Sequence, residues 1–210
     1  MFKRLALFAL LAATPAHAET LSAEIGRTGL TATEARLSAL PSPSDDETLA
    51  LGAVQFLRAI EGSFQTRWTY GMTDRSGMLP LLRLPLDDNP APTVFDPKVI
   101  AQIFTDAEAG LAAAITTFAK LPDTSPAAME LGVADLWFDV NQNTTREQGE
   151  GLADIVGSFT TGLPEGGTQP TAQPSIRFDI ADAAWASAYA HLLAGVANAV
   201  LAYDPSEPIA

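Results

Sequence analysis

The chain has 210 residues, with 25 Asp and Glu against 12 Lys and Arg, a formal net charge of −13 and no cysteine. Nucleic acids and anionic membrane surfaces bind to positively charged protein surfaces, so this balance argues against both as partners. The lack of cysteine excludes disulfides, a lipid-modified N-terminal cysteine and thiolate metal sites. The length suits one domain with a sizeable hydrophobic core, which must hold the fold together.

Residues 1–18, MFKRLALFALLAATPAHA, have the pattern of a secretory signal peptide. Lys3 and Arg4 form a positive start, an apolar run follows, and an A-x-A cleavage sequence ends at Ala18. The apolar run is shorter than the roughly 20 residues that span a bilayer. We therefore expect cleavage after Ala18, a periplasmic or secreted location, and a single helical domain over residues 19–210.

Cleavage would make the chain more acidic, because it removes two of the 12 basic residues and no acidic one, giving 10 − 25 = −15. His191 would be the only histidine left, which excludes zinc or copper sites built from several histidines. Such a charge favours divalent cations. We find no second apolar run of spanning length and expect no stable membrane insertion.

Segments with the 3.6-residue period of amphipathic helices alternate with loops rich in proline and glycine. Each helix is expected to begin at a capping residue type. The predicted helices are Thr31–Leu40, Asp45–Phe64, Asp96–Phe118, and a segment that starts at Asp179 or Asp182 and ends before Pro205. The last of these is the most apolar and has a face of small residues, so we expect it to be the central helix of the core.

Apolar and polar residues alternate over 129–133, 136–140 and 176–180, which predicts short strands. The expected fold is therefore mainly α: a compact helical domain with a short β-hairpin or small sheet near residues 129–140 and 175–180.

Residues 139–150 read Asp-Val-Asn-Gln-Asn-Thr-Thr-Arg-Glu-Gln-Gly-Glu. Calcium prefers six to eight oxygens at about 2.3–2.6 Å, and alternate residues of a tight loop can direct their oxygens at one point. This segment resembles the calcium loop of the EF-hand family. The resemblance implies calcium as a cofactor, bound by the side chains or carbonyls of Asp139, Asn141, Asn143, Thr145, Glu147 and Glu150.

The segment also departs from the family pattern. Thr144 stands where the family has glycine, so it must adopt a left-handed conformation or reroute the loop. Arg146 stands where an apolar residue joins two paired loops, and no second loop exists in the chain. A single unpaired site of weak affinity, on the order of 10⁻⁴–10⁻³ M, and of structural role is implied. The alternative is an ordinary turn whose Asn, Asp and Thr side chains cap their own backbone.

Basic and aromatic residues gather over 58–83. Arg67, Trp68 and Tyr70 could line a pocket for an anionic or aromatic ligand. Alternatively the arginines pair with nearby carboxylates, as Arg58 and Glu61 can when they lie three apart on a helix.

No catalytic signature accompanies these features. Our leading hypothesis is an exported binding or scaffold protein, with a protein partner or small ligand, that carries one structural calcium ion. The alternative is a small-molecule-binding protein or enzyme that uses the pocket around 58–83. A helical-repeat adaptor would instead need an exposed apolar groove between stacked helices.

Overall fold

The computed structural model describes residues 19–72, 80–82, 84, 86–157 and 174–203. The predicted signal peptide, residues 1–18, lies outside the described residues. The elements are α1 (Leu21–Ser38), α2 (Asp45–Thr69), α3 (Lys98–Phe118), β1 (Ala128–Gly132), α4 (Leu152–Gly157), β2 (Ser175–Asp179) and α5 (Ile180–Leu201). The prediction of a mainly α fold with a small sheet is confirmed.

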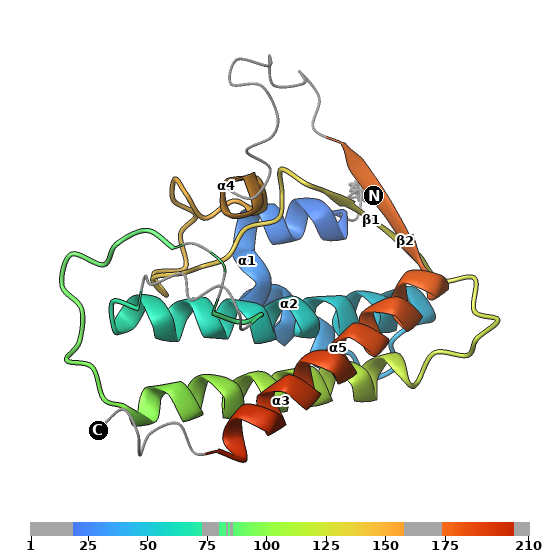
Figure 1. The fold of residues 1–210 in the computed structure, drawn as a ribbon. Helices are drawn as coiled ribbons and strands as arrows, with labels where there is room; N and C mark the ends of the chain where they lie inside the picture. Colours follow the sequence, from blue (N-terminus) through green and yellow to red (C-terminus); the bar gives the residue numbers. More distant parts are fainter. Residues whose placement is uncertain (1–18, 73–79, 83, 85, 158–173, 204–210) are drawn as a thin grey trace, which may run out of the picture.

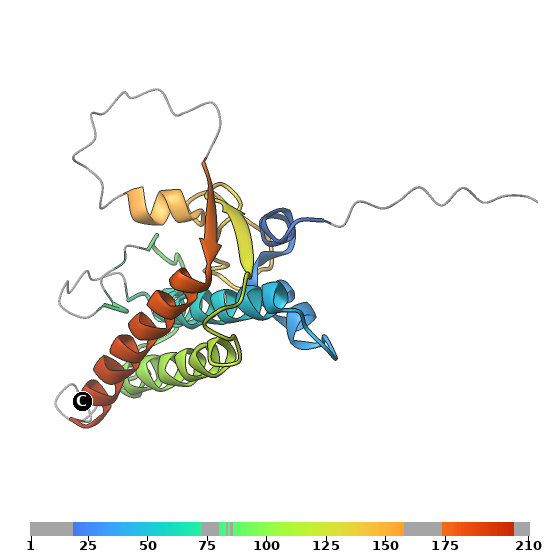
Figure 2. The ribbon, with the colours of Figure 1, turned by 90° about the vertical axis from the view of Figure 1, so that its right-hand side faces the viewer.

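Helix α2 lies in the middle of the molecule. Figure 1 shows α3 and α5 on one side of it, and α1, α4 and the two strands on the other. Figure 2 shows the same arrangement from the side, with the strands standing above α2 and the α3 layer below it. The hydrophobic core accordingly consists of side-chain clusters on both faces of α2, one centred on Phe64 and others formed with Phe118 and Leu111 of α3.

The start of α2 follows from a capping box. Ser44 accepts a hydrogen bond from the Glu47 backbone N–H at 3.2 Å, and the Glu47 carboxylate accepts one from the Ser44 backbone N–H at 2.8 Å. These two bonds satisfy donors that a helix start leaves free. The predicted start near Asp45 is therefore confirmed, and the helix continues past Phe64 to Thr69.

Helix α5 also begins as predicted, because both candidate caps act together. Asp179 accepts from the Ala181 N–H at 3.0 Å, and Asp182 accepts from the Asp179 N–H at 2.9 Å. Its expected position as the central core helix is wrong, however. The small residues that it buries lie toward α3, whereas Trp185 is 67% exposed and Leu192 60% exposed. An apolar composition on all sides does not tell which face is buried.

By length and composition, α3 and α5 are both long and apolar enough to cross a membrane. The expectation that no second segment reaches that length is therefore wrong. Helix α3 nevertheless buries apolar residues such as Ile103, Phe104 and Leu111 inside the structure. Core helices of water-exposed proteins meet the same two criteria.

The two strands pair antiparallel, with Met129 opposite Phe178 and Leu131 opposite Ile176. The predicted strand at 136–140 is reduced to a single bridge between Trp137 and Gly151. Two backbone hydrogen bonds accompany that bridge, from Phe138 N–H to Glu150 O and from Leu152 N–H to Leu136 O, both 2.9 Å. They close the base of the 139–150 loop, and helix α4 follows directly after it.

Helix α1 starts ten residues before the predicted Thr31, at Leu21, and is interrupted at Gly29. Gly29 has φ 76° and ψ 176°, a region that is essentially restricted to glycine. The Trp137 ring lies against it, and the Trp137 indole N–H donates to the Ile25 carbonyl at 2.8 Å. The interruption explains why the part of α1 before Gly29 was not predicted: the helical spacing of apolar residues does not continue across the break.

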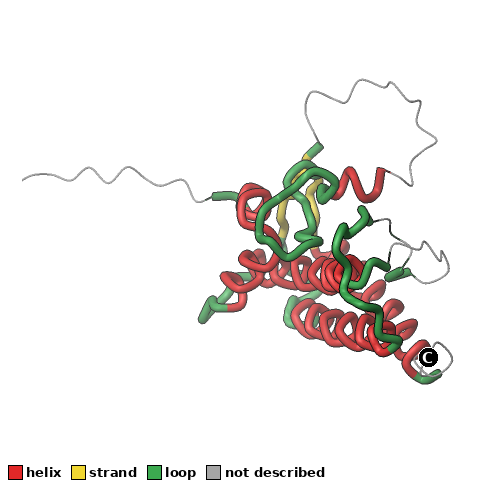
Figure 3. The backbone as a smooth tube through the Cα atoms, turned by 90° about the vertical axis from the view of Figure 1, so that its left-hand side faces the viewer, coloured by secondary structure: helices red, strands yellow, loops and turns green. Residues whose placement is uncertain are grey.

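Figure 3 shows the remaining connections as long loops. The stretch from Leu86 to Pro97 runs along the outside and leads into α3. Asp96 accepts a hydrogen bond from the Lys98 N–H at 2.9 Å, which supports its predicted role at the helix start.

We predict that Gly29→Ala destabilises the fold by about 1–3 kcal/mol, because alanine disfavours this backbone conformation. The added Cβ would also lie 2.9 Å from Cζ2 of Trp137. Gly62→Ala is the matched control: Gly62 lies within α2, and a Cβ there meets nothing within 4 Å. That change should stabilise by about 0.5–1 kcal/mol. Urea unfolding of the three chains measures both effects, and equal effects of the two substitutions would contradict the assignment.

Candidate functional site

The 139–150 loop is closed at its base and open at its tip. Asp139 and Glu150, at its two ends, are buried, with exposed fractions of 7% and 6%. Asn141 is half-buried, while Asn143 and Glu147 are exposed. The two carboxylates at the base therefore sit in a drier environment than the polar groups at the tip.

Asp139 organises the first half of the loop. Its Oδ1 accepts a hydrogen bond from the Asn143 N–H and its Oδ2 one from the Thr144 N–H, both 3.0 Å. Asn143 in turn accepts from the Thr145 N–H at 2.7 Å. Gln142 and Thr144 both have φ 62°. Thr144 therefore adopts the left-handed conformation that the EF-hand-like loop requires at this position, where the family has glycine.

Glu150 and Glu147 organise the second half. Glu150 accepts from the Val140 N–H through Oε1 at 2.9 Å and from the Glu147 N–H through Oε2 at 2.8 Å. The side-chain amides of Asn141 and Asn143 donate to the two Glu147 oxygens, each at 2.9 Å. Each side-chain contact in the loop is of the kind expected for a turn that caps its own backbone.

The structure thus brings all six proposed calcium ligands into one hydrogen-bonded loop. Five of them take part through their side chains, and Thr145 takes part through its backbone N–H. Within the described residues, no group of three or more His, Cys, Asp or Glu side chains is arranged to hold a metal ion. The loop has the proposed residues near one another, but its oxygens are directed at N–H groups.

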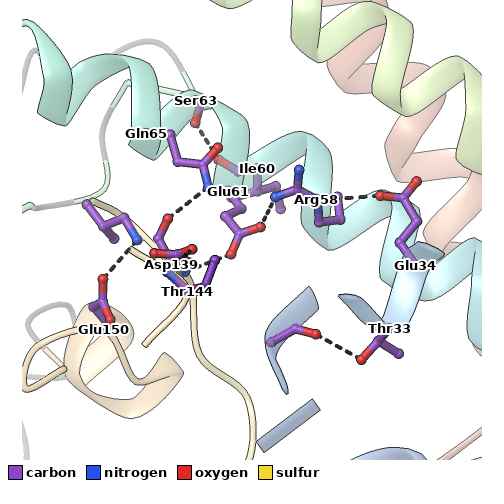
Figure 4. A network of polar contacts seen from close by, with 12 residues as sticks. Thr33, Glu34, Arg58, Ile60, Glu61, Ser63, Gln65, Asp139, Thr144 and Glu150 are labelled. Carbon is purple, nitrogen blue, oxygen red and sulfur yellow. Dashed lines mark hydrogen bonds and ion pairs between the residues drawn. The ribbon is translucent and has the colours of Figure 1, made fainter. Parts of the chain in front are cut away.

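Helix α2 holds the start of this loop (Figure 4). Glu61 is fully buried and accepts from the Asp139 N–H at 2.7 Å, and Gln65 donates to the Asp139 carbonyl at 2.8 Å. Arg58 donates to the second Glu61 oxygen, and its Nε lies 3.4 Å from a carboxylate oxygen of Glu34 on α1. This polar network joins α1, α2 and the loop across the core.

The spacing of Arg58 and Glu61 in the sequence predicts that they pair, but it does not predict the contact between Glu61 and Asp139. A signal is nevertheless present: Glu61 interrupts the apolar residues Leu57, Ile60 and Phe64 of the core-facing part of α2. A carboxylate at such a position requires buried hydrogen-bond donors. Their identity depends on the fold, since Asp139 is 78 positions away.

The buried carboxylates have perturbed acidities. Burial raises the pKa of Glu61 above its ordinary value, and the charge and hydrogen bond of Arg58 only partly oppose this shift. Burial also raises the pKa of Glu150; its bonds from the Glu147 and Val140 N–H groups oppose the shift, while the Asp139 and Glu147 charges add to it. Among the ion pairs of the described residues, none involves the loop carboxylates Asp139, Glu147 and Glu150.

The structure does not bring Arg67, Trp68 and Tyr70 into one pocket. Arg67 is buried; it donates to the Leu84 carbonyl at 2.8 Å, and its Nη2 has no partner among the described residues. Loss of solvent lowers its pKa to about 10. Tyr70 packs instead with the cluster around Phe104.

Trp68 alone of the three lines a hollow, one of about 710 Å³ between the 86–90 stretch and the 139–150 loop. Among the described residues, its lining carries several carboxylates and no basic side chain; the acidic members are Asp87, Asp88, Glu147, Glu150 and Asp154. None of the arginines expected for an anionic ligand is therefore among the described residues that line the hollow. Arg75 and Arg83 lie outside the described residues.

Comparison with protein-family models, with curated proteins and with solved structures gives no match. Function is therefore inferred from the side chains and their surroundings.

We predict that Glu61→Gln lowers the free energy of unfolding at neutral pH by about 2–3 kcal/mol, below the 3–5 kcal/mol of a fully buried pair because Arg58 is partly exposed. Glutamine has one oxygen where the carboxylate has two, so its NH2 group faces either the Asp139 N–H or Arg58, and one buried donor loses its acceptor whatever the charge of Glu61. Glu130→Gln, on the exposed β1 position, is the control and should change stability by less than about 0.5 kcal/mol. Comparable losses in the two variants would contradict a structural role of the network.

The same pair of chains tests the pKa shift of Glu61. Because its pKa is raised above the ordinary 4.5 in the folded state, folding favours the protonated form. The contribution of Glu61 to stability is then fully present below pH 4.5 and falls as the pH rises through the folded-state pKa. Urea unfolding from pH 4 to 8 should show the stability difference between wild type and Glu61→Gln shrinking with rising pH; a growing difference would contradict it.

Proposed function

We propose that this chain is an exported, non-enzymatic binding protein and that its Asp139–Glu150 loop takes up one structural calcium ion. One observation carries the calcium proposal. Two buried carboxylates, Asp139 and Glu150, lie at the base of the loop; burial chiefly, and the Asp139 charge to a lesser extent, raise the pKa of Glu150, and no ion pair of the described residues compensates them. A hard divalent cation would relieve that repulsion with the oxygen ligands it prefers.

Binding would keep some of the present contacts and exchange others. The backbone of Asp139 is already fixed by Glu61 and Gln65, so one ligand is positioned from α2. Asn141 and Asn143 now donate their amides to Glu147 and would have to turn their oxygens inward. Glu150 would exchange two backbone hydrogen bonds for the ion. Such exchanges favour a weak affinity, on the order of 10⁻⁴–10⁻³ M.

The export part of the proposal is supported by the signal-peptide pattern of residues 1–18. The binding role is supported by the lack of a catalytic signature; His191, for example, is exposed on α5. The alternative of a ligand or enzyme site built by Arg67, Trp68 and Tyr70 has less support, because these side chains lie in different surroundings.

We predict that the chain from Glu19 to Ala210 melts at a higher temperature in 10 mM calcium than in chelator or magnesium. With a Kd near 10⁻⁴ M, mass action gives about 2.7 kcal/mol of stabilisation at that concentration. The double variant Asp139→Ala, Glu150→Ala should lose this gain. Differential scanning calorimetry measures the difference between calcium and chelator within each chain, so a general loss of stability does not affect it.

A matched control is Asp123→Asn with Glu130→Gln, which removes two exposed carboxylates that lie neither in the loop nor in the hollow beside it. That variant should keep the calcium gain. If wild type melts at the same temperature with calcium, magnesium and chelator, the loop is a self-capped turn and the calcium proposal is wrong.

A further inference from the structure

An apolar cavity of about 330 Å³ lies between α2 and the first half of α5 and against the two strands; its wall includes Leu136 and Leu152, whose backbone hydrogen bond closes the base of the 139–150 loop. All of its described lining residues except Asp182 are apolar. Phe56 and Leu57 of α2 line one side, Trp185 and Ala186 of α5 another, and Phe178 of β2 a third. Ligand-binding pockets in proteins are typically about 300–1,000 Å³ and mostly apolar, so this cavity falls at the lower end of that range.

The cavity opens at α5. Trp185 lines it and is 67% exposed, so its ring lies at the opening. The ring stacks on Tyr189 with centroids 5.4 Å apart, and Tyr189 lies 6.2 Å from the ring of Phe56. A continuous aromatic surface therefore leads from solvent to the wall of the cavity. Exposed aromatic rings at an opening offer contact area to an apolar ligand at a small entropic cost.

The volume limits the size of an occupant. A dry cavity of about 150 Å³ in another protein holds one benzene molecule. This cavity is about twice that volume, which fits two aromatic rings or an acyl chain of similar bulk.

The charge of the lining limits its chemistry. Asp182 is exposed at the rim, where it accepts a hydrogen bond from the Asp179 N–H, and none of the described residues that line the cavity is basic. An anionic ligand would meet a carboxylate and an acidic protein, and it would find no partner for its own charge. A neutral ligand avoids this penalty.

We infer that this cavity binds a neutral, hydrophobic small molecule about the size of two aromatic rings. The inference rests on the binding role proposed above but not on calcium binding: Leu136 and Leu152 at the base of the loop line the cavity, whereas no residue of 139–150 does.

N,N-dimethyl-1-naphthylamine, a neutral two-ring fluorophore, is the probe, titrated into the chain from Glu19 to Ala210. We expect saturable binding of one molecule per chain with a blue-shifted, enhanced emission. 5-(Dimethylamino)naphthalene-1-sulfonate has the same ring scaffold with an added sulfonate, and we expect it to bind at least ten-fold more weakly. Non-saturable binding of the neutral probe, or equal affinity for both, would overturn the inference.

Ala53→Phe places a ring in the cavity from α2 and should reduce the affinity for the neutral probe at least ten-fold. Ala112→Phe, on an exposed position of α3, is the matched control and should leave it unchanged. If Ala53→Phe fails to fold by far-ultraviolet circular dichroism, Ala186→Phe fills the cavity from α5 instead. Equal binding by a folded cavity variant and the control would contradict the assignment.

Two further measurements separate this inference from its rivals. Sedimentation equilibrium should show a monomer with and without probe; self-association that the probe disrupts would mean that a second copy fills the cavity, and it would overturn the proposal. The Asp139→Ala, Glu150→Ala variant should retain probe binding whether or not calcium stabilises the wild type. Failure of the calcium proposal and failure of the cavity proposal therefore give different results.

Discussion

Helix α2 binds both backbone groups of Asp139: the Glu61 carboxylate accepts from its N–H, and the Gln65 amide donates to its carbonyl. This contact requires a buried charge, because Glu61 is fully enclosed and is compensated chiefly by Arg58. Arg58 in turn reaches Glu34 on α1. The layer of α1, α4 and the strands is thus joined to α2 by directional hydrogen bonds as well as by apolar packing, and directional bonds fix position in a way that apolar contact alone does not. The layer of α3 and α5 is held to α2 mainly by apolar contact and close approach, together with the hydrogen bond that the Thr117 hydroxyl donates to Gln55 at 2.7 Å. Gly110 of α3, for example, faces Ala59 of α2 so closely that an added Cβ would lie 2.9 Å from its side chain.

Local chemistry allowed much of this fold to be predicted. The caps at Ser44 and Asp179 act on backbone groups two or three residues away, so their effect can be read in the sequence. The antiparallel pairing of β1 with β2 agrees with the predicted alternation.

Two features of the fold depend on tertiary contacts and were not predicted. Helix α1 is broken where Trp137, more than a hundred residues later, lies against Gly29. Helix α5 is apolar all round, and only the position of α3 determines that Ala190 and Ala197 face inward.

The candidate sites differ in the same way. The 139–150 loop was predictable because its residues interact with one another, and Thr144 adopts the conformation that its position demands. The role of Glu61 was not predictable, since its partner is distant in sequence. The proposed pocket of Arg67, Trp68 and Tyr70 assumed that neighbours in sequence share a surface. On a helix, successive residues point in different directions, and these three reach the core, an acidic hollow and a separate apolar cluster. The cavity beside α5 has the opposite character, because its lining comes from every layer of the molecule and from no single motif.

The network around Glu61 also bears on how long the folded state lasts. Its bonds join residues 74 and 78 positions apart, so a long stretch of chain must be enclosed before either bond can form. Contacts of this kind are expected to arise after the main folding barrier, and their loss then accelerates unfolding more than it slows folding. The chain has no disulfide to delay its opening. Buried hydrogen bonds that form late therefore act as a kinetic lock: they contribute to the lifetime of the folded state, on which resistance to proteases depends when cleavage outpaces refolding.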